Sequence, residues 1–409
     1  MSFDYAAHVR PDLPPPSPRW AGFPRYNFIG GHNDADSIPA DGLAAAAERV
    51  LRRDGRKLAT YGMDSGPQGY RPLREFVAAT LAARAHLPCS ADEVLITSGS
   101  GQGLELVSAL FLQPGDTLLV EASTYGGSLT RLRRRGANIV GVELDDEGMR
   151  IDSLASVLEG LRSKGIKPRY IYTIPTVQNP TGTTMGRERR LEMLRVAAAH
   201  DVPILEDDCY ADLLWGAERP PAIRSLDRDE RVIYVGSFSK SISPALRLGY
   251  VVAGWDVLSR LLALKTDGGT GALEQLVLAE YCPQAFDRHV AALTGTLRDK
   301  CATMLAALEQ EFGAAAEFHA PNGGIFVWIT LPEPVDTSKL AQIALAEGVA
   351  INAGPEWVAA PESGRRSFRL CLGNTSEQEI REGVARLAEI CHREFGLPLT
   401  GTNVLRAAD

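Results

Sequence analysis

The chain has 409 residues, with 43 Lys and Arg against 51 Asp and Glu, which gives a formal net charge of −8 at pH 7. Hydrophobic residues make up 45% of the chain and charged residues 23%, a composition that excludes a wholly disordered protein. The acidic balance argues against a surface that binds nucleic acid or an anionic membrane. The one basic cluster, Arg131 with Arg133–Arg135, indicates a solvated helix face.

The N-terminus has neither the basic start nor the apolar run of a secretory signal, so we expect a cytoplasmic protein. No apolar stretch reaches the length that a membrane span needs. The six cysteines and seven histidines are dispersed, without Cys-x-x-Cys or His-x-x-x-His pairs. This spacing predicts reduced thiols and no metal site.

The proline-rich residues 11–18 predict an extended arm within residues 1–24, because proline lacks the backbone donor that a helix or a central strand needs. From residue 94 onward, short apolar runs alternate with helical periods such as Gly186–His200, a pattern typical of an α/β sheet with helices on both sides. The segment before the seventh run is short for a parallel crossover, so that strand is expected to be antiparallel. The seven runs are Val94–Thr97, Thr117–Glu121, Ile139–Glu143, Tyr170–Ile174, Val202–Glu206, Arg231–Val235 and Gly249–Ala253.

After residue 255 the pattern changes to longer helices and two further strand-like runs, which predicts a second, smaller α+β domain. The expected helices are Val257–Lys265, Leu273–Tyr281, His289–Phe312 and Glu377–Phe395, and the strands are Gly324–Thr330 and Ser367–Leu372. The predicted organisation is an arm (1–24), a first part of the small domain (25–55), a large domain (56–285) and the C-terminal part of the small domain (286–400).

Polar side chains follow the strands of the predicted sheet where ligands bind in open α/β folds. A glycine-rich turn, Thr97–Gly103, follows the first strand and precedes a helix, whose free N–H groups attract a phosphate. The carboxylates Glu206–Asp208 follow the fifth strand, and Lys240 follows the sixth. Burial of a lysine there would lower its pKa and make it a nucleophilic amine, while Arg247 supplies a cation for a phosphate.

Seven motifs occur in order between about residues 25 and 395. They are Tyr61-Gly62 with Gln68-Gly69-Tyr70, Asn179-Pro180-Thr181-Gly182, Asp207 to Tyr210, Ser237-Phe238-Ser239-Lys240, Arg247-Leu248-Gly249-Tyr250, Gly323-Gly324 to Trp328, and Ser367-Phe368-Arg369-Leu370. Together they resemble the fold-type-I, class I/II aminotransferases that depend on pyridoxal phosphate. The most similar subgroup is that of the aminoadipate and kynurenine aminotransferases with the aminotransferase domain of MocR regulators.

The resemblance implies that Lys240 binds pyridoxal phosphate as an internal aldimine and moves a proton at the substrate Cα. Asp207 would pair with the pyridinium nitrogen, so that the ring acts as an electron sink, and Asp208 would be structural. Arg369 would bind the substrate α-carboxylate through a bidentate fork.

The remaining roles follow from the same resemblance. Tyr125 would stack on the ring, and Tyr210 and Asn179 would hydrogen-bond its O3′; Asn179 and Gly31 would also contact the substrate. The phosphate would be held by Ser100, the amides of Gly101 and Gln102, Ser237, Ser239 and Arg247. Tyr61 would reach the phosphate of a neighbouring subunit, which implies a homodimer with shared sites.

The expected reaction is amino-group transfer between an L-amino acid and a 2-oxo acid through pyridoxamine phosphate. The alternative is another pyridoxal-phosphate reaction of specialised amino-acid metabolism, such as cyclisation, elimination or replacement at Cβ or Cγ, or oxidation, because one fold hosts many reactions. A MocR-like ligand-sensing regulator is disfavoured, because the pattern begins by about residue 25 and the chain is acidic.

Two segments depart from the family pattern. The region Gly30–Asp36 is acidic, and Lys265–Gly271 is rich in glycine. The carboxylates of Asn33–Asp36 and Asp267 predict that the distal end of the substrate is cationic or rich in hydrogen-bonding groups, because a second carboxylate there would meet like charge. Gly268, Gly269 and Gly271 would leave room for a bulky group.

Overall fold

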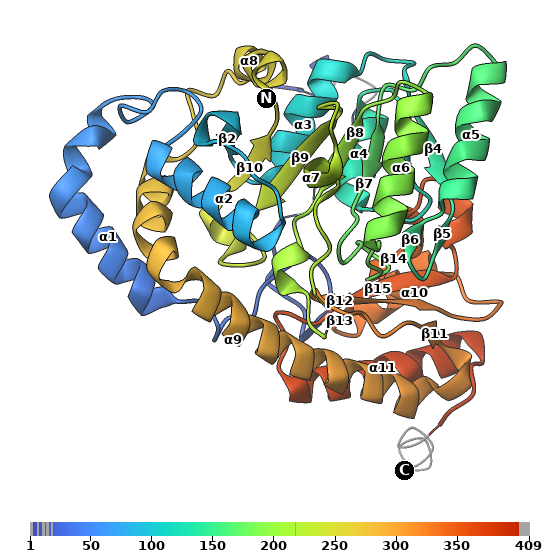
Figure 1. Cartoon of the computed structure of the whole chain (residues 1–409). Coiled ribbons are helices and arrows are strands. Elements are labelled where there is room, and N and C mark those ends of the chain that lie inside the picture. The colour runs from blue at the N-terminus through green and yellow to red at the C-terminus, as the bar shows by residue number, and fades with distance from the viewer. Residues whose placement is uncertain are drawn as a thin grey trace.

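A large α/β layer structure and a smaller α+β unit share one long helix (Figure 1). The computed structural model describes residues 19–216 and 218–400 and, before them, residues 3–5, 8–9, 13 and 16–17. Most of the predicted arm over residues 11–18 therefore lies outside the described residues. No helix among those described is long and apolar enough to cross a membrane.

The central sheet has seven strands in the order β2-β10-β9-β8-β7-β3-β4. β10 is antiparallel to both of its neighbours, whereas every other pair is parallel. The predicted mostly parallel sheet with an antiparallel seventh strand is thus confirmed. The strands are β2 (Val94–Thr97), β3 (Thr117–Glu121), β4 (Asn138–Val142), β7 (Ile171–Thr173), β8 (Ile204–Asp207), β9 (Val232–Ser237) and β10 (Gly249–Val252).

Helices cover both faces of this sheet because successive apolar side chains point to opposite sides of each strand. On β3, Leu118 and Val120 pack in the cluster that includes α3, α4 and α8, whereas Leu119 packs with α5 and α6 on the other face. The helices of this part are α2 (Arg71–Arg84), α3 (Ser100–Phe111), α4 (Gly126–Arg134), α5 (Ile151–Ser163), α6 (Arg187–Ala199), α7 (Ile223–Leu226) and α8 (Trp255–Leu264); a short hairpin joins β5 (Leu144–Asp145) to β6 (Gly148–Met149).

The two helices predicted at Leu273–Tyr281 and His289–Phe312 form one continuous helix, α9 (Ala272–Phe312). Pro283 lies inside it, and an interior proline costs about 3 kcal/mol because it removes a hydrogen bond and clashes with the preceding turn. Tyr281, Cys282 and Phe286 around the proline are buried, and their packing offsets that cost. Figure 1 shows α9 running from the large sheet to the small unit.

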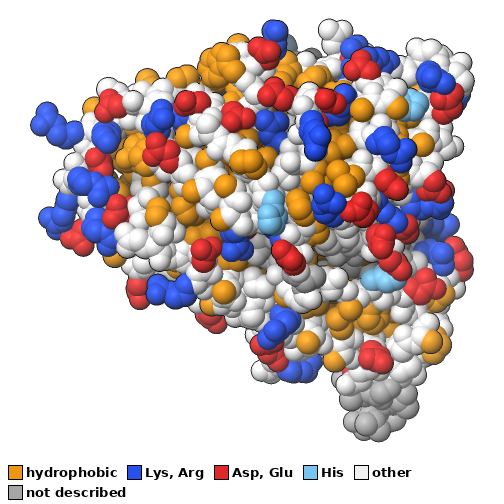
Figure 2. All heavy atoms as spheres, viewed as in Figure 1, with side chains coloured by type: hydrophobic (Ala, Val, Ile, Leu, Met, Phe, Trp, Pro, Cys, Tyr) orange, Lys and Arg blue, Asp and Glu red, His pale blue; other side chains and the backbone are white. Residues whose placement is uncertain are grey.

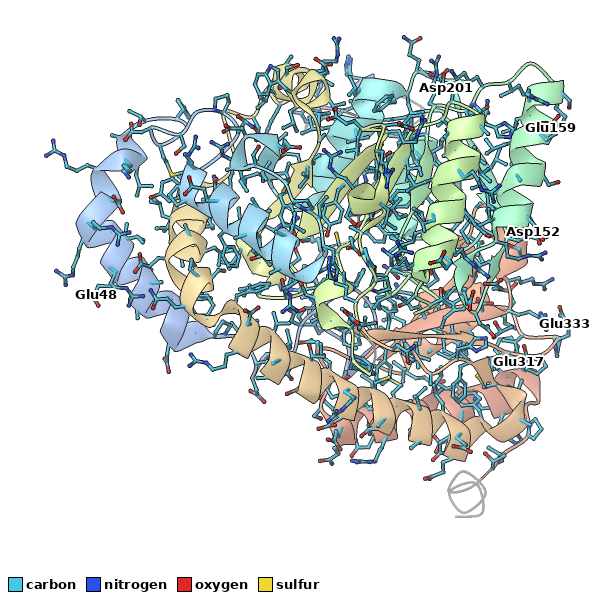
Figure 3. The ribbon with its side chains drawn as sticks, in the orientation of Figure 1. Glu48, Asp152, Glu159, Asp201, Glu317 and Glu333 are labelled. Carbon is cyan, nitrogen blue, oxygen red and sulfur yellow. The ribbon has the colours of Figure 1, made fainter. Side chains whose placement is uncertain are left out.

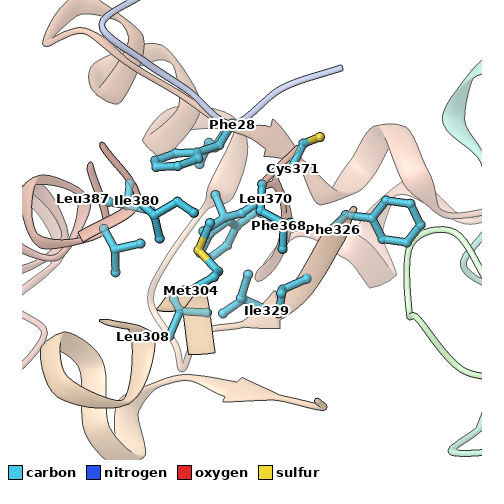
Figure 4. Close-up of a cluster of buried hydrophobic side chains, with 14 of the residues drawn as sticks. Phe28, Met304, Leu308, Phe326, Ile329, Phe368, Leu370, Cys371, Ile380 and Leu387 are labelled. Carbon is cyan, nitrogen blue, oxygen red and sulfur yellow. The ribbon is translucent and has the colours of Figure 1, made fainter. Parts of the chain in front are cut away.

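The small unit has its own hydrophobic core, in which side chains from its sheet pack against α9 and α11 (Figure 4). Phe28, from the N-terminal segment, lies within this core and is fully buried. The sheet order is β11-β12-β15-β14, and β1 pairs in parallel with β13. The elements are β1 (Tyr26–Asn27), β11 (Glu317–Phe318), β12 (Phe326–Thr330), α10 (Thr337–Ala346), β13 (Val349–Ala350), β14 (Asn352–Ala353), β15 (Ser367–Cys371) and α11 (Glu377–Phe395).

The predicted N-terminal part of the small domain, residues 25–55, divides between the two cores. Tyr26 and Phe28 join the small core, but Ala46 and Val50 of α1 (Ala40–Asp54) belong to the cluster that includes Tyr281 and lies beside the large sheet. Helix α1 therefore packs with the large unit, because its apolar face lies against the first half of α9.

Acidic and basic side chains are interspersed over the face of the molecule seen in Figure 2. Six exposed carboxylates from elements far apart in the sequence lie at the rim and point outward (Figure 3): Glu48, Asp152, Glu159, Asp201, Glu317 and Glu333. These surface charges are solvated and spread over the molecule.

One carboxylate of the large sheet is fully buried and organises a loop. Glu121, at the end of β3, accepts hydrogen bonds from Thr173 Oγ1 (2.7 Å), Ile174 N (3.0 Å), Gln178 Nε2 (2.8 Å) and Thr124 Oγ1 (3.3 Å). Burial raises the pKa of Glu121 to about 7, and these four donors oppose that rise. Glu121 thereby fixes the loop that follows β7.

Glu121→Gln is expected to lower the free energy of unfolding by about 1–3 kcal/mol, because an amide NH₂ faces donors that need an acceptor. Urea denaturation of both proteins measures this difference. Glu159→Gln, on the exposed rim, serves as the matched control and should change stability by less than about 0.5 kcal/mol. Equal effects of the two substitutions would contradict the anchoring role of Glu121.

Candidate active site

A cavity of about 690 Å³ lies at the carboxyl ends of the parallel strands and extends to the small unit. This is the edge at which open α/β sheets bind ligands, because side chains that follow neighbouring strands meet there. Every predicted site residue except Gln102 and Tyr61 lines this cavity: Gly31, Ser100, Gly101, Tyr125, Asn179, Asp207, Tyr210, Ser237, Ser239, Lys240, Arg247 and Arg369.

Lys240 lies just after β9, with its amine inside the cavity. Its Nζ donates a hydrogen bond to the backbone oxygen of Gly31 (2.6 Å) and lies 5.8 Å from the centre of the Tyr210 ring. Burial, helped by the positive charges of Arg369 and Arg247, lowers the pKa of Lys240 to about 8. A substantial fraction of the amine is therefore neutral, and hence nucleophilic, close to neutral pH.

Asp207 and Asp208 point in different directions, because neighbouring side chains alternate along the strand. Asp208 accepts hydrogen bonds from Arg219 Nη2 (2.7 Å) and Tyr234 OH (3.0 Å), away from the cavity. Asp207 accepts one from Tyr172 OH at Oδ2 (2.8 Å), and its buried Oδ1 has no hydrogen-bond partner. Asp207 is thus the carboxylate that can accept a bond from a protonated aromatic nitrogen in the cavity.

An anion site lies beside Asp207, at the N-terminus of α3. Ser100 and Gly101 form the first turn of this helix, where backbone N–H groups and the helix dipole favour a phosphate. Gly99 precedes them with φ +76, and a Cβ at that position would overlap the guanidinium of Arg247. Arg247 donates to Pro244 O (3.0 Å) and Ser98 O (3.3 Å), and within the described ranges no carboxylate pairs with it. Its charge is therefore available to an anion.

Arg369, from β15 of the small unit, is a second cation whose charge is available to an anion. It is 2% exposed and donates to Asn179 Oδ1 (3.0 Å), Asn352 Oδ1 (2.9 Å) and the backbone oxygen of Gly30. Asn179 in turn donates to Tyr210 OH (3.2 Å). Since all these acceptors are neutral, the guanidinium keeps its full charge for a carboxylate ligand.

The two other predicted residues lie elsewhere. The backbone N–H of Gln102 donates to Gly99 O (3.2 Å), so it already has a partner. The Gln102 side chain accepts from Ser98 N (2.8 Å) and donates to Asp267 (2.6 Å). The Tyr61 side chain is 93% exposed and lines a separate cavity of about 720 Å³. That cavity includes the glycine-rich residues 268–271.

The predicted preference for a cationic substrate loses its physical basis in the structure. Asp34 is paired with Lys300 (2.6 Å) and accepts from Ser37 (2.5 Å), while Asp267 is paired with Lys265 (2.6 Å). These pairings hold the pKa of Asp34 below its usual value and that of Asp267 at about 2. Asp34, Asp36 and Asp267 do not line the cavity, so they give no reason for it to reject a second carboxylate of the substrate.

The basic cluster predicted to be a solvated helix face also reaches the site. Arg131 and Arg133 line the cavity, and no carboxylate in the described part of the chain pairs with either. The Arg131 guanidinium lies over the Tyr125 ring, 5.5 Å from its centre. Helix α4 begins directly after Tyr125, so its first turns carry these arginines along the cavity wall.

Sequence reasoning also missed Trp357, Asn352 and Cys209 of the cavity. The Trp357 ring lies 3.8 Å from the guanidinium carbon of Arg369, Asn352 bonds the same group, and Cys209 lies between Asp207 and Tyr210. Cys209 stands inside a recognised motif and could have been found there. Trp357 and Asn352 lie in loops and short strands with no local pattern that points to a ligand.

The sequence matches the family described as aminotransferase class I and II over residues 31–387. The chain belongs to this family. It is 34% identical to aromatic-amino-acid aminotransferase 1 of Thermococcus litoralis, over 90% of this chain and 88% of that protein. It is 35% identical to the 2-aminoadipate transaminase of Thermus thermophilus, over 88% of each chain.

A solved structure extends this similarity to the fold. The α-aminoadipate aminotransferase of Thermus thermophilus, complexed with N-(5′-phosphopyridoxyl)-L-leucine, superposes on this aminotransferase with a TM-score of 0.83 and 34% identity, over 91% of this chain and 93% of that one. The protein is therefore a transferase that moves amino groups between amino acids and oxo acids.

Asp207→Asn is expected to reduce kcat/KM of the aminotransferase by two to three orders of magnitude, about 3–4 kcal/mol, because it removes a charge that faces the reacting ligand. The matched change Asp208→Asn disturbs the bonds with Arg219 and Tyr234 outside the cavity and should leave most of the activity. Steady-state kinetics of both variants, with folding checked by circular dichroism, measures the difference. A severe loss in Asp208→Asn with a mild loss in Asp207→Asn would reverse the assignment.

Proposed function

We propose that the protein is a pyridoxal-phosphate-dependent aminotransferase that works between an L-amino acid and a 2-oxo acid, with Lys240 as the residue that carries the cofactor. The observation that supports this most is the joint placement of three polar groups around one cavity. They are the amine of Lys240, the unpartnered Oδ1 of Asp207, and the anion site of α3 with Arg247. An amine, a hydrogen-bond acceptor and a phosphate site match the three polar ends of this cofactor.

Bound pyridoxal phosphate supplies an aromatic ring that accepts the electron pair released at the substrate Cα. In this proposal Asp207 holds the ring nitrogen in its protonated form, and Tyr125 packs on the ring. Lys240, with its lowered pKa, takes the proton from the substrate Cα and returns it on the other side of the transferred nitrogen. Arg369 and Asn179 bind the α-carboxylate and fix the orientation of the Cα–H bond.

Borohydride treatment of the loaded enzyme should fix one pyridoxyl group on the peptide that contains Lys240, as detected by mass spectrometry. The rate at which the apoenzyme takes up the cofactor covalently should rise with pH and level off above about 8, because only the neutral amine of Lys240 reacts and its pKa is lowered to about 8. Lys240→Ala should remain unlabelled while still binding the cofactor through the phosphate site. A label on any other lysine would refute the proposed site.

For the substrate, we propose a side chain that is acidic or aromatic and not cationic. Five cationic side chains line the cavity against the two carboxylates of Asp207 and Glu356. If Arg247 and Arg369 bind the phosphate and the α-carboxylate, Arg131 and Arg133 remain as unpaired cations. Trp357 and Tyr125, 6.0 Å apart, add an aromatic wall. The relatives named for aromatic amino acids and for 2-aminoadipate support the same range of substrates.

Conversion of the bound cofactor by single amino acids, followed by stopped-flow absorbance, tests this range. Glutamate, 2-aminoadipate and phenylalanine should react at least tenfold faster than lysine or arginine, since a cationic side chain meets like charge in the cavity. The double variant Arg131→Gln with Arg133→Gln should reduce this difference in reaction rate. Faster reaction of arginine than of 2-aminoadipate would contradict the charge argument, and loss of the amino acid without any aminated cofactor would indicate a different reaction.

We also propose that the protein is a homodimer in which Tyr61 reaches the phosphate site of the partner. Tyr61 is almost fully exposed, and the exposed Leu58 lines the same cavity together with Leu262. Apolar side chains gathered at one cavity mark a surface that another protein covers. Sedimentation should give a dimer, and Tyr61→Ala should weaken cofactor affinity without changing the mass. A monomer with unchanged affinity would refute the shared site.

A further inference from the structure

A chain of buried hydrogen bonds leads from Asp207 to a cation on α4. Tyr172 OH donates to Asp207 Oδ2 (2.8 Å), Ser128 Oγ donates to Tyr172 OH (3.1 Å), and Arg131 Nη2 donates to Ser128 Oγ (3.3 Å). Tyr172 and Ser128 are 1% and 5% exposed. The four residues come from β7, β8 and α4, so only the tertiary structure brings them together.

The direction of these bonds follows from the chemistry of the side chains. A guanidinium can only donate, so Ser128 must accept from Arg131 and give its single hydroxyl hydrogen to Tyr172. Tyr172 then gives its only hydrogen to Asp207 Oδ2. That oxygen is held as an acceptor, and Oδ1, which has no partner, is the one left for a donor in the cavity.

We propose that Tyr172, Ser128 and Arg131 form a positioning relay that orients the Asp207 carboxylate and keeps it anionic for the ring nitrogen of the cofactor. This inference rests on the proposed function. Tyr172 and Ser128 are positioning residues, because they act on the cofactor through Asp207. The relay also ties Asp207 to α4, the helix that begins after Tyr125, so one helix sets both the acceptor and the aromatic wall.

The charges around Asp207 agree with this role. Burial raises the pKa of Asp207, and the neighbouring Cys209 thiol, the hydrogen bond from Tyr172 and the charge of Arg131 oppose that rise, while Asp208 adds to it. Among these groups, Arg131 is the only cation. Without the relay, a carboxylate that is 4% exposed would gain a proton more readily and lose its attraction for a protonated ring nitrogen.

Tyr170, directly before the same strand, provides a matched control. It lies two residues before Tyr172, is 2% exposed, and contacts the hydroxyl of Ser108 (3.2 Å) as Tyr172 contacts that of Ser128. No hydrogen bond joins Tyr170 to Asp207 in the described residues. Tyr170→Phe therefore removes an equally buried hydroxyl from the same face of the sheet without touching the relay.

The test compares the affinity of each apoenzyme for pyridoxal phosphate and for its analogue with carbon in place of the ring nitrogen, measured by fluorescence titration. Tyr172→Phe should weaken binding of the natural cofactor at least tenfold, and Ser128→Ala about threefold, while Tyr170→Phe changes it less than twofold. All four proteins should bind the analogue within twofold of one another, because it has no ring nitrogen for Asp207 to hold.

Equal losses of Tyr172→Phe for both ligands would show a merely structural role and overturn the relay. Unchanged affinity of Tyr172→Phe for the natural cofactor would overturn it as well. If Tyr172→Phe fails to fold, Ser128→Ala carries the same comparison. Failure of the proposed function is separate, because the unsubstituted protein would then show no binding of pyridoxal phosphate and no label on Lys240.

Discussion

Side-chain alternation along β8 is the constraint on which the site depends. Three consecutive carboxylates, Glu206, Asp207 and Asp208, lie at the end of this buried strand. Burying them costs free energy unless they accept hydrogen bonds. Glu206 accepts hydrogen bonds from the amides of Ile223 and Arg224, and Asp208 accepts one from Arg219, so both carboxylates have donors outside the cavity. Asp207 alone points the other way. The strand thereby delivers a single carboxylate to the cavity, with one oxygen bound and one free.

The N-terminal segment joins the two units of the molecule across this cavity. Backbone oxygens of Gly30 and Gly31 accept from Arg369 and from Lys240, and the Asn33 side chain donates to the backbone oxygen of Lys240 (3.2 Å). A Cβ on Gly31 would lie 2.6 Å from Lys240 Nζ, so a side chain at this position would displace the amine. Behind the segment, the buried pair of Asp34 with Lys300 anchors it to α9. The acidic residues that looked like a substrate site in the sequence are thus part of the framework.

The positive charge of the cavity follows from the neutral partners of its cations. Lys240, Arg247 and Arg369 contact backbone oxygens or neutral side chains and no carboxylate in the described structure. Cations held by neutral dipoles remain attractive to anionic ligands, because their charge is not cancelled. A phosphate and a carboxylate, the anionic groups of cofactor and substrate in the proposed reaction, are the ligands that such a cavity stabilises.

The sequence alone determined the fold class, the positions of the seven strands of the large sheet to within about two residues, the antiparallel β10 and much of the cavity lining, because these depend on local hydrophobic periodicity and on motifs at strand ends. It did not determine the continuity of α9 through Pro283, the partners of Asp34 and Asp267, or the arrival of Arg131, Asn352 and Trp357 at the site. Those features depend on which side chains meet across elements far apart in the chain. A charge is free or paired only according to its neighbours in space, and that is why tertiary structure alone decided the electrostatics of the site.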